Sequence, residues 1–347
     1  MQLTHRDGRT QPRRGAPAAR SGPNGYSRRV LSRRRLLLGI AAGATAAQAG
    51  CTLDPDVAWL PAATPSPLAI AGAQAAADRA ATLAARAGVL RAKAADGKLA
   101  EAQVRALGWF ESACDDHARV LASADPARRQ TTAPPAVTPP PTPADARAGY
   151  AGITEALDGD VTGHRTRALA ADGAAALLWA GLAAFTATMN DRLPSGTFTG
   201  ANDPATTTPA LTGEDWGRRL LLRSYEARYA LQSVLAAPGL TAGQRGQVRR
   251  GLAAWVAVRD ALTDRRRAEG ADVPAAQPAY QVTMPATRRQ AWALGARVQG
   301  QALPEVGAWV ANADSTARPW AVDLLVATSR SAVAFGAPAL RWPGWSG

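Results

Sequence analysis

The residues best suited to metal chemistry form a run of four potential ligands, Cys114, Asp115, Asp116 and His117. Neighbouring positions of a helix point in different directions, so only Cys114 and His117, three residues apart, would share a face. One such pair does not complete a metal site. We therefore expect an exposed helix surface here, with an incomplete metal site as the alternative.

A second group, residues 158–163 (DGDVTG), matches the first half of a calcium-binding loop. The twelfth position of such a loop carries a bidentate glutamate, and here it is Leu169. We therefore favour a turn between two helices, in which Asp160 or Thr162 caps a helix that begins at His164. No useful calcium binding is expected.

Other catalytic signals are missing from the sequence. Arg265, Arg266 and Arg267 could bind a phosphate, but they fall at the end of a predicted helix, where cations complement the helix dipole. We interpret them as a solvated helix end. The sequence has no glycine-rich phosphate loop, no nucleophile elbow and no Cys–His–carboxylate set with metal spacing. It therefore predicts no catalytic residue and no cofactor.

The net charge of +13 is unevenly distributed along the 347 residues. Residues 1–50 hold ten of the 40 Lys and Arg but one of the 27 Asp and Glu. The remaining chain carries 30 basic and 26 acidic residues, an excess of only +4. A strongly basic protein would suggest a nucleic-acid partner. Because the excess lies in a removable segment, we expect none.

The N-terminal segment has the parts of an export signal. Arg33 and Arg34 stand just before three leucines and a mildly apolar stretch that ends at Cys51. Charged residues, an apolar stretch and small residues before a cleavage point are typical of a secretory signal, and paired arginines of its twin-arginine type. A transmembrane anchor would need about 20 apolar residues, more than this stretch provides.

Two cleavage sites compete in this segment. The AQA sequence before Gly50 suits an ordinary signal peptidase and would give a secreted protein, whereas AGC, ending at Cys51, suits lipidation of that cysteine. Gln48 stands where leucine is usual, which weakens the second site. A disulfide with Cys114 is an alternative use of Cys51, but an acylated anchor explains its position better. We predict an exported lipoprotein on the extracytoplasmic face of the cell membrane.

Helical patterning dominates the rest of the chain and no run reads as a strand, so we predict an all-α fold. The predicted segments are a signal peptide (1–50), a tether (51–67), a helical hairpin (68–126), a proline-rich linker (127–143), a helical segment (144–193), a loop (194–211) and four helices (212–341).

Capping signals mark the four C-terminal helices, which are predicted to follow Thr212, Thr241, Thr287 and Ser315. Gln244 and Gln290 complete capping boxes for the second and third helices. Pro304 should kink the third helix, and Gly336 should end the fourth. Four tryptophans each fall on the apolar stripe of a different one of these helices, and we interpret them as core and interface anchors: Trp216, Trp255, Trp292 and Trp320.

The run AWVAVRDAL at 254–262 is similar to an AHRARRDAL segment of an uncharacterised ferritin-like domain family of exported lipoproteins from high-GC Gram-positive bacteria. The PAY sequence at 278–280, Trp309 and the RWPG sequence at 341–344 also resemble that family. The resemblance covers roughly 212–345 well. It implies a ferritin-like four-helix bundle with an additional helical N-terminal half.

The chain departs from ferritin-like metal sites. Such sites use glutamates from two helices and Glu-x-x-His from two others, and this chain has no Glu-x-x-His. Trp255 stands at the family's histidine position and Gln299 where a family glutamate aligns. We predict a metal-free bundle centred on an Arg259–Glu226 ion pair, with Gln299 accepting a further hydrogen bond. The alternative is that Arg259 extends along the bundle edge.

These observations favour a non-enzymatic envelope lipoprotein whose bundle binds an envelope protein or an apolar ligand. The rival interpretation is a di-iron or manganese ferritin-like oxidase or storage protein. A third, a scaffold without a ligand, is not distinguished from the first by the sequence.

Overall fold

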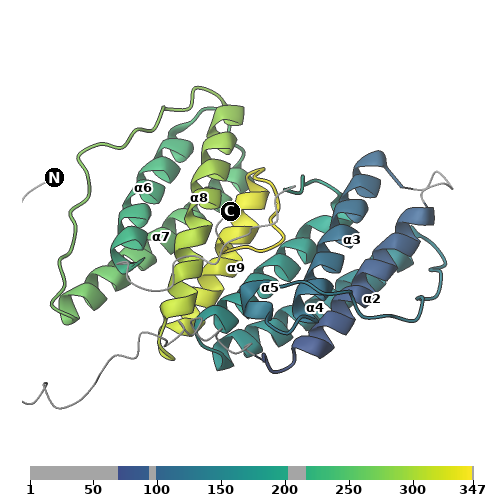
Figure 1. The fold of residues 1–347 in the computed structure, drawn as a ribbon. Helices are drawn as coiled ribbons and strands as arrows, with labels where there is room; N and C mark the ends of the chain where they lie inside the picture. The colour runs from purple at the N-terminus through teal and green to yellow at the C-terminus, as the bar shows by residue number, and fades with distance from the viewer. Residues whose placement is uncertain (1–68, 94–98, 202–215, 346–347) are drawn as a thin grey trace, which may run out of the picture. The chain divides into compact units, whose positions relative to one another are not determined.

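The computed structural model describes residues 69–93, 99–201 and 216–345. Eight α-helices and two short 3₁₀ turns form within these ranges, and a single isolated bridge, between Gly200 and Ala339, is the only β pairing there. The helices are α2 (Ala73–Ala92), α3 (Glu101–Leu121), α4 (Ala146–Ala170), α5 (Gly173–Arg192), α6 (Trp216–Ala236), α7 (Ala242–Ala268), α8 (Arg288–Asn312) and α9 (Arg318–Ala334) (Figure 1). The prediction of an all-α fold is confirmed.

The N-terminal half consists of two helical hairpins, α2–α3 and α4–α5, with α2 also packed on α4. Alanine fills much of the buried face of α2, which lets the neighbouring helices approach closely. The proline-rich segment after α3 forms neither helix nor strand between Thr131 and Pro143. Its Val137 packs against Ala80, Ala81 and Ala118, so this segment covers the α2–α3 hairpin.

Helix α4 continues without interruption through residues 158–163, so the predicted turn there is wrong. Its buried residues keep helical spacing across the segment: Ile153, Leu157, Asp160, His164 and Ala168. Asp160 pairs with Arg79 of α2, at 2.8 Å between Nη1 and Oδ1. Burial of this stripe outweighs the two glycines, and the chain turns instead just before Gly173, whose φ is +56°. A calcium loop therefore does not form here.

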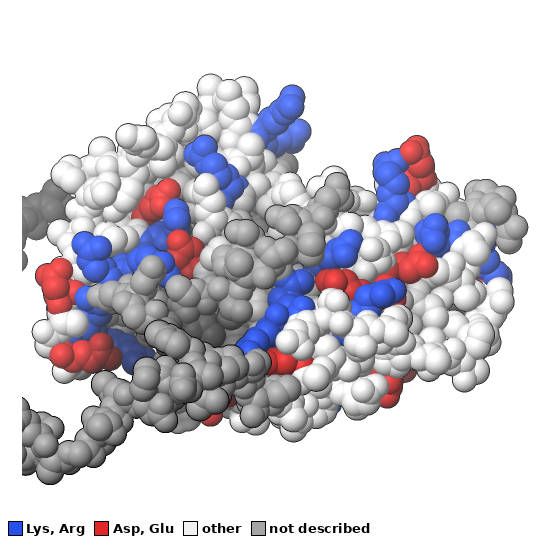
Figure 2. All heavy atoms as spheres, viewed as in Figure 1, with Lys and Arg blue, Asp and Glu red and all other residues white. Residues whose placement is uncertain are grey.

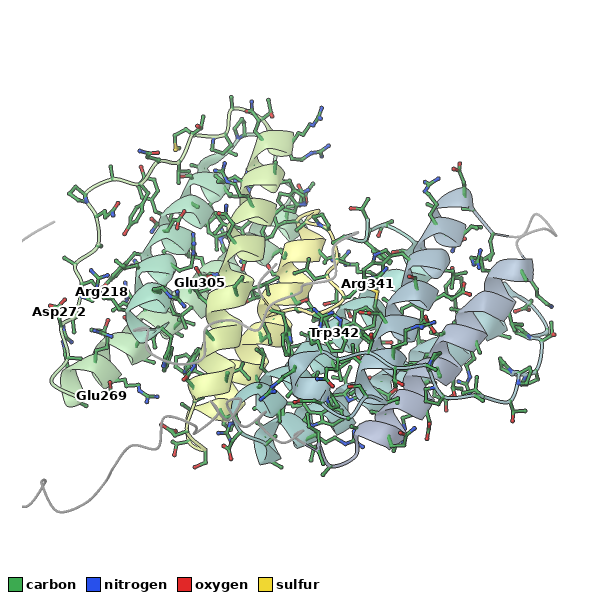
Figure 3. The ribbon with its side chains drawn as sticks, viewed as in Figure 1. Arg218, Glu269, Asp272, Glu305, Arg341 and Trp342 are labelled. Carbon is green, nitrogen blue, oxygen red and sulfur yellow. The ribbon has the colours of Figure 1, made fainter. Side chains whose placement is uncertain are left out.

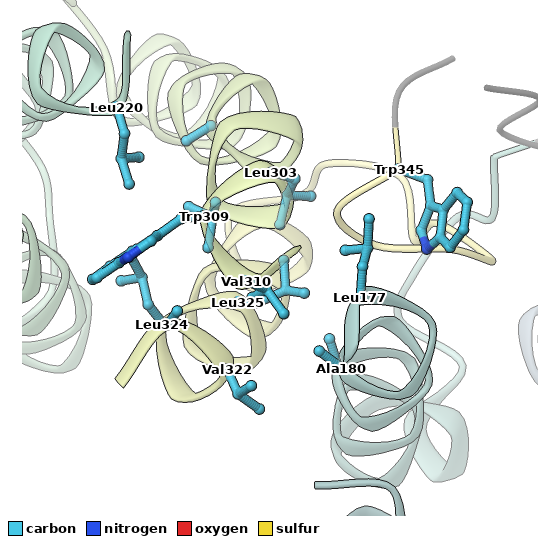
Figure 4. Close-up of a cluster of buried hydrophobic side chains, with 14 of the residues drawn as sticks. Leu177, Ala180, Leu220, Leu303, Trp309, Val310, Val322, Leu324, Leu325 and Trp345 are labelled. Carbon is cyan, nitrogen blue, oxygen red and sulfur yellow. The ribbon is translucent and has the colours of Figure 1, made fainter. Parts of the chain in front are cut away.

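Helix α5 is the central helix of the protein, because it packs against α4, α8 and α9. Every residue from Ala176 to Met189 is buried. Figure 4 shows Leu177 and Ala180 directed toward side chains of α8 and α9. Residues Gly173–Ser195 are long and apolar enough to cross a membrane, but most of them are buried inside the protein, as expected for a core helix.

In the C-terminal half, α6 packs on both α7 and α8, and α8 packs on α9, while α7 and α9 barely meet. The capping boxes of α7 and α8 are confirmed: Thr241 accepts from the backbone of Gln244, and Thr287 from that of Gln290. The predicted cap at Thr212 lies outside the described residues. Local side-chain chemistry therefore defines these helix starts.

Helix α8 runs on through Pro304, although proline cannot donate the usual backbone hydrogen bond at that position. Helix α9 begins with Pro319 in its first turn and is followed by Gly336, whose φ is +94°. The four tryptophans predicted as anchors lie in or against one core cluster: Trp216, Trp255, Trp292 and Trp320. Their predicted role is confirmed.

Candidate functional site

A cleft of about 470 Å³ lies between α7 and α9, with the end of α5 at one side and α8 beneath it. It exists because α7 packs closely on α6 but makes few contacts with α9 or α8. Its lining is partly apolar, from Ala254, Leu324 and Ala327, and partly polar. This volume falls in the range of about 300–1,000 Å³ that is common for small-ligand sites.

Trp255 and Gln299 form the inner part of this cleft, each with only 1% of its surface exposed. The indole Nε1 of Trp255 donates to Oε1 of Gln299 at 3.3 Å. Because an indole N–H can only donate, this contact assigns the amide oxygen to Trp255 and leaves Nε2 as a donor. A Cβ at Gly251 would lie 3.2 Å from that Nε2, so the glycine leaves room for the amide.

The rim of the cleft carries three arginines and one aspartate. Arg330 makes a bidentate pair with Asp191, at 2.7 Å from Nε and 2.9 Å from Nη2. Arg192 and Arg250 have no ion-pair partner among the residues that the structure describes. Gln247, also in the lining, holds a buried Nε2 without a hydrogen-bond partner there. The cleft is therefore rich in donors and positively charged.

The predicted Arg259–Glu226 pair is wrong. Arg259 donates from Nε to Asp260 at 2.7 Å, and its side chain is 25% exposed. Glu226 instead accepts from Arg223, one turn earlier on α6, at 2.5 Å. Arg223 also donates to Glu305 of α8 at 3.2 Å; Glu305 is labelled in Figure 3. Each charge thus finds a nearer partner, which costs less desolvation than a central ion pair, and Arg259 extends toward the bundle edge.

Of the three residues predicted at the bundle centre, Gln299 is buried there, bonded to Trp255. A neutral amide–indole contact therefore takes the place of the predicted ion pair. The sequence placed both residues on inward stripes but did not join them, because α7 and α8 approach each other at this point only in the folded chain.

The three arginines at the end of α7 are only partly solvated. Arg265 pairs with Glu269 at 2.8 Å and Arg267 with Asp264 at 3.7 Å, both at the surface. Arg266 is buried, and its Nε donates to the backbone oxygen of Asp272 at 2.6 Å. The prediction of a solvated helix end is wrong for Arg266, which closes the turn after the helix.

Cys114 and His117 share one face of α3, as predicted, but that face is buried rather than exposed. They line a small cavity of about 20 Å³ together with Asp160 and His164 of α4. The apolar residues around them, such as Phe110, continue the buried stripe of α3, which is why this face turns inward. Among the described residues, no group of three or more His, Cys, Asp or Glu is arranged to hold a metal ion.

Burial determines the protonation of this cluster. Burial, together with a smaller effect of the nearby Arg167 charge, lowers the pKa of His164 to about 3. It likewise lowers the pKa of His117 to about 4, against the opposing effect of Asp116. The pKa of the Cys114 thiol is raised by burial, so both rings are neutral and the thiol is protonated at neutral pH.

The C-terminal segment 341–345 joins the two halves of the fold, a role that the sequence did not reveal. The Nε2 of His117 donates to the backbone oxygen of Arg341 at 2.8 Å. The indole Nε1 of Trp342 donates to Asp116 at 2.7 Å, and Arg129 lies over the same indole, 4.9 Å from its centre. Arg341 and Trp342 are labelled in Figure 3.

Arg33, Arg34 and Cys51, the predicted signal and lipidation residues, lie outside the described residues. No curated protein and no solved structure matches this chain. Residues 221–346, which cover most of α6, all of α7 to α9 and the C-terminal segment, match one family. The C-terminal half of this chain therefore carries a domain of unknown function (DUF4439).

Proposed function

We propose that this protein is a non-enzymatic lipoprotein of the cell envelope, exported through its N-terminal signal and anchored by Cys51. Its C-terminal helices form a metal-free ferritin-like bundle that binds an apolar ligand. The observation that carries the proposal is the cleft of about 470 Å³ that opens onto Trp255 and Gln299 inside the bundle. Those are the positions at which the resembling family has histidine and glutamate.

The arrangement of α6 to α9 supports the ferritin-like part of the proposal. The four helices are 17 to 27 residues long, and a long connection, residues 269–287, joins α7 to α8. Long crossover connections of this kind occur in ferritin-like bundles, whose sites are built from side chains on facing helices.

The lining of the cleft favours binding over catalysis. Its titratable groups are three arginines and Asp191, and Asp191 is engaged by Arg330. No histidine, cysteine or glutamate lines it. General acid–base catalysis needs a group that exchanges protons near neutral pH, which arginine does not.

The charge distribution supports the absence of a nucleic-acid partner. On the face drawn in Figure 2, basic and acidic side chains are interspersed. Binding to the phosphate backbone depends on a patch of one sign, in which each neutralised phosphate adds to the affinity.

The anchor is tested by cell fractionation. The wild-type protein should sediment with membranes, because an acylated, diacylglycerol-modified cysteine gives stable attachment. Cys51→Ala should appear in the medium. Cys114→Ala is the matched control, since Cys114 is buried in the helical body, and should stay on membranes. Retention of Cys51→Ala on membranes would show that another segment anchors the chain.

The binding function is tested with a neutral apolar probe, N-phenyl-1-naphthylamine, whose fluorescence rises in apolar sites. We expect saturable binding that is lost in Ala254→Trp, which fills the cleft. Ala257→Trp, on the same helix but exposed and outside the lining, should bind as the wild type does. Equal binding by all three proteins would contradict the proposal.

The rival metal function is tested by elemental analysis of the purified protein. A ferritin-like oxidase would carry about two iron or manganese ions per chain in a carboxylate and histidine site. We expect neither metal in stoichiometric amount. About two equivalents per chain would replace the proposed binding function with the rival one.

A further inference from the structure

We infer that the cleft between α7 and α9 recognises an apolar molecule that ends in an oxyanion, a carboxylate or a phosphate. The inference rests on the proposed ligand-binding function and goes further by naming the headgroup. Arg192 and Arg250 would bind the oxyanion, and Ala254, Ala327 and Ala334 would pack against the apolar body.

The first argument is that donors outnumber free acceptors in the cleft. Gln299 is 1% exposed, and its Nε2 keeps its protons available because its oxygen is taken by Trp255. The Nε2 of Gln247 is buried and has no partner in the described part of the chain. A buried donor without an acceptor is unfavourable. An oxyanion offers only acceptors, so it complements this lining better than a neutral or cationic group does.

The second argument is charge. Asp191 neutralises Arg330 through two short contacts, and it is the only carboxylate of the lining. Arg192, at the end of α5, and Arg250, on α7, stand on different helices around the same cleft. Neither has a partner carboxylate within the described ranges, so the site holds two uncompensated positive charges. A guanidinium group binds a carboxylate or a phosphate through two parallel hydrogen bonds. Such a headgroup should therefore bind to these arginines more strongly than an uncharged one.

The third argument is the apolar lining. The accessible apolar lining comes from Ala254 of α7 and from Ala327 and Ala334 of α9, and the buried side chains of Trp255 and Leu324 complete it. A free inorganic anion would leave this surface in contact with water. An apolar body attached to the anion would cover it, at a gain that grows with the area removed from water.

The test is a calorimetric titration of the exported chain carrying Cys51→Ala, which removes the acyl groups. Four probes are compared below their micellar concentrations: laurate, dodecyl phosphate, dodecanol and inorganic phosphate. We expect at least one of the two amphiphilic anions to bind at least tenfold more tightly than dodecanol, since hydrogen bonds to a charged group typically contribute about that factor or more. The tighter of the two identifies the headgroup.

Arginine variants test which side chains bind the headgroup. Arg192→Gln combined with Arg250→Gln should weaken binding of the preferred anion at least tenfold and leave dodecanol unchanged. Arg249→Gln is the matched control, because Arg249 is the exposed neighbour of Arg250 on α7 and does not line the cleft. It should bind the anion as the wild type does.

The outcomes separate this inference from the function on which it rests. Equal affinity for laurate, dodecyl phosphate and dodecanol, or full affinity in the double arginine variant, would overturn the oxyanion inference while the cleft would still bind apolar molecules. Inorganic phosphate binding as tightly as dodecyl phosphate would overturn the requirement for an apolar body. If none of the three twelve-carbon probes binds, both the inference and the proposed binding function fail.

Discussion

Lowering the pH from 7.5 to 5.0 should destabilise this protein through its two buried histidines. Burial among apolar helices lowers the pKa of His117 to about 4 and that of His164 to about 3. In the unfolded chain each imidazole titrates near its ordinary value of about 6.5. Below that pH the imidazoles of the unfolded chain therefore bind protons, whereas those of the folded protein stay neutral.

The sign and size of the effect follow from linkage. Burial favours the neutral imidazole, so the pKa in the folded state lies below that in the unfolded state. The folded state is then fully stable above the unfolded pKa, and its free energy of unfolding falls as the pH drops toward the folded pKa. Each pH unit costs about 1.4 kcal/mol per histidine, so the interval from about 6.5 to 5.0 costs about 2 kcal/mol for each ring. Asp160 acts in the opposite direction, because burial raises its pKa and its folded form accepts a proton more readily.

The assay is urea unfolding followed by circular dichroism at pH 7.5 and pH 5.0. The free energy of unfolding of the wild type should be about 4 kcal/mol lower at pH 5.0 than at pH 7.5, reduced by the opposing effect of Asp160. His164→Gln should lose about half as much, and the double variant with His117→Gln still less, since glutamine does not titrate. The measured quantity is the change in the free energy of unfolding between pH 7.5 and pH 5.0. A variant that is destabilised equally at both pH values does not alter it.

Two results would refute this reasoning. A wild type whose free energy of unfolding is unchanged between pH 7.5 and 5.0 would show that the imidazoles protonate freely in the folded state. Equal losses in the wild type and in His164→Gln would place the pH dependence on other groups, such as Asp160 and its partner Arg79.

Three further predictions concern the packing of the chain. Gly307→Ala should lower the free energy of unfolding in urea by at least about 2 kcal/mol, because its Cβ would lie 2.0 Å from the backbone oxygen of Gly344. The control Gly300→Ala, on the same helix, meets nothing within 4 Å and should stabilise by about 0.5–1 kcal/mol. Equal effects of the two changes would contradict the packing of the C-terminal segment. Trp342→Phe should lower the free energy of unfolding by about 1.5–3 kcal/mol, because it removes the hydrogen bond to Asp116. A double-mutant cycle with Asp116→Asn should show that the two changes are coupled, and additive effects would argue against the contact. Calorimetric titration with calcium should show no micromolar binding, since residues 158–163 are helical, and micromolar affinity that is lost in Asp158→Ala would refute this.

The sequence alone determined the helical class and most helix ends in the C-terminal half. Thr241 and Thr287 bond to backbone groups three residues away, and Gly336 takes a backbone conformation that disfavours other residues. Such interactions involve a few consecutive residues, so their outcome is readable from local sequence. The inward position of Trp255 followed in the same way from helical periodicity.

Tertiary structure decided whatever depends on residues far apart in the chain. Residues 158–163 carry local turn signals, but Asp160 meets Arg79 of α2 and its stripe is buried, so the helix continues. The inward face of His117 was likewise decided by packing against distant helices. The predicted pair between Glu226 of α6 and Arg259 of α7 does not form, because the folded helices leave each charge beside a partner on its own helix, Arg223 and Asp260. The cleft itself comes from the separation of α7 and α9, a distance that no local sequence signal sets, because it results from how all the packed helices bury their apolar faces at once.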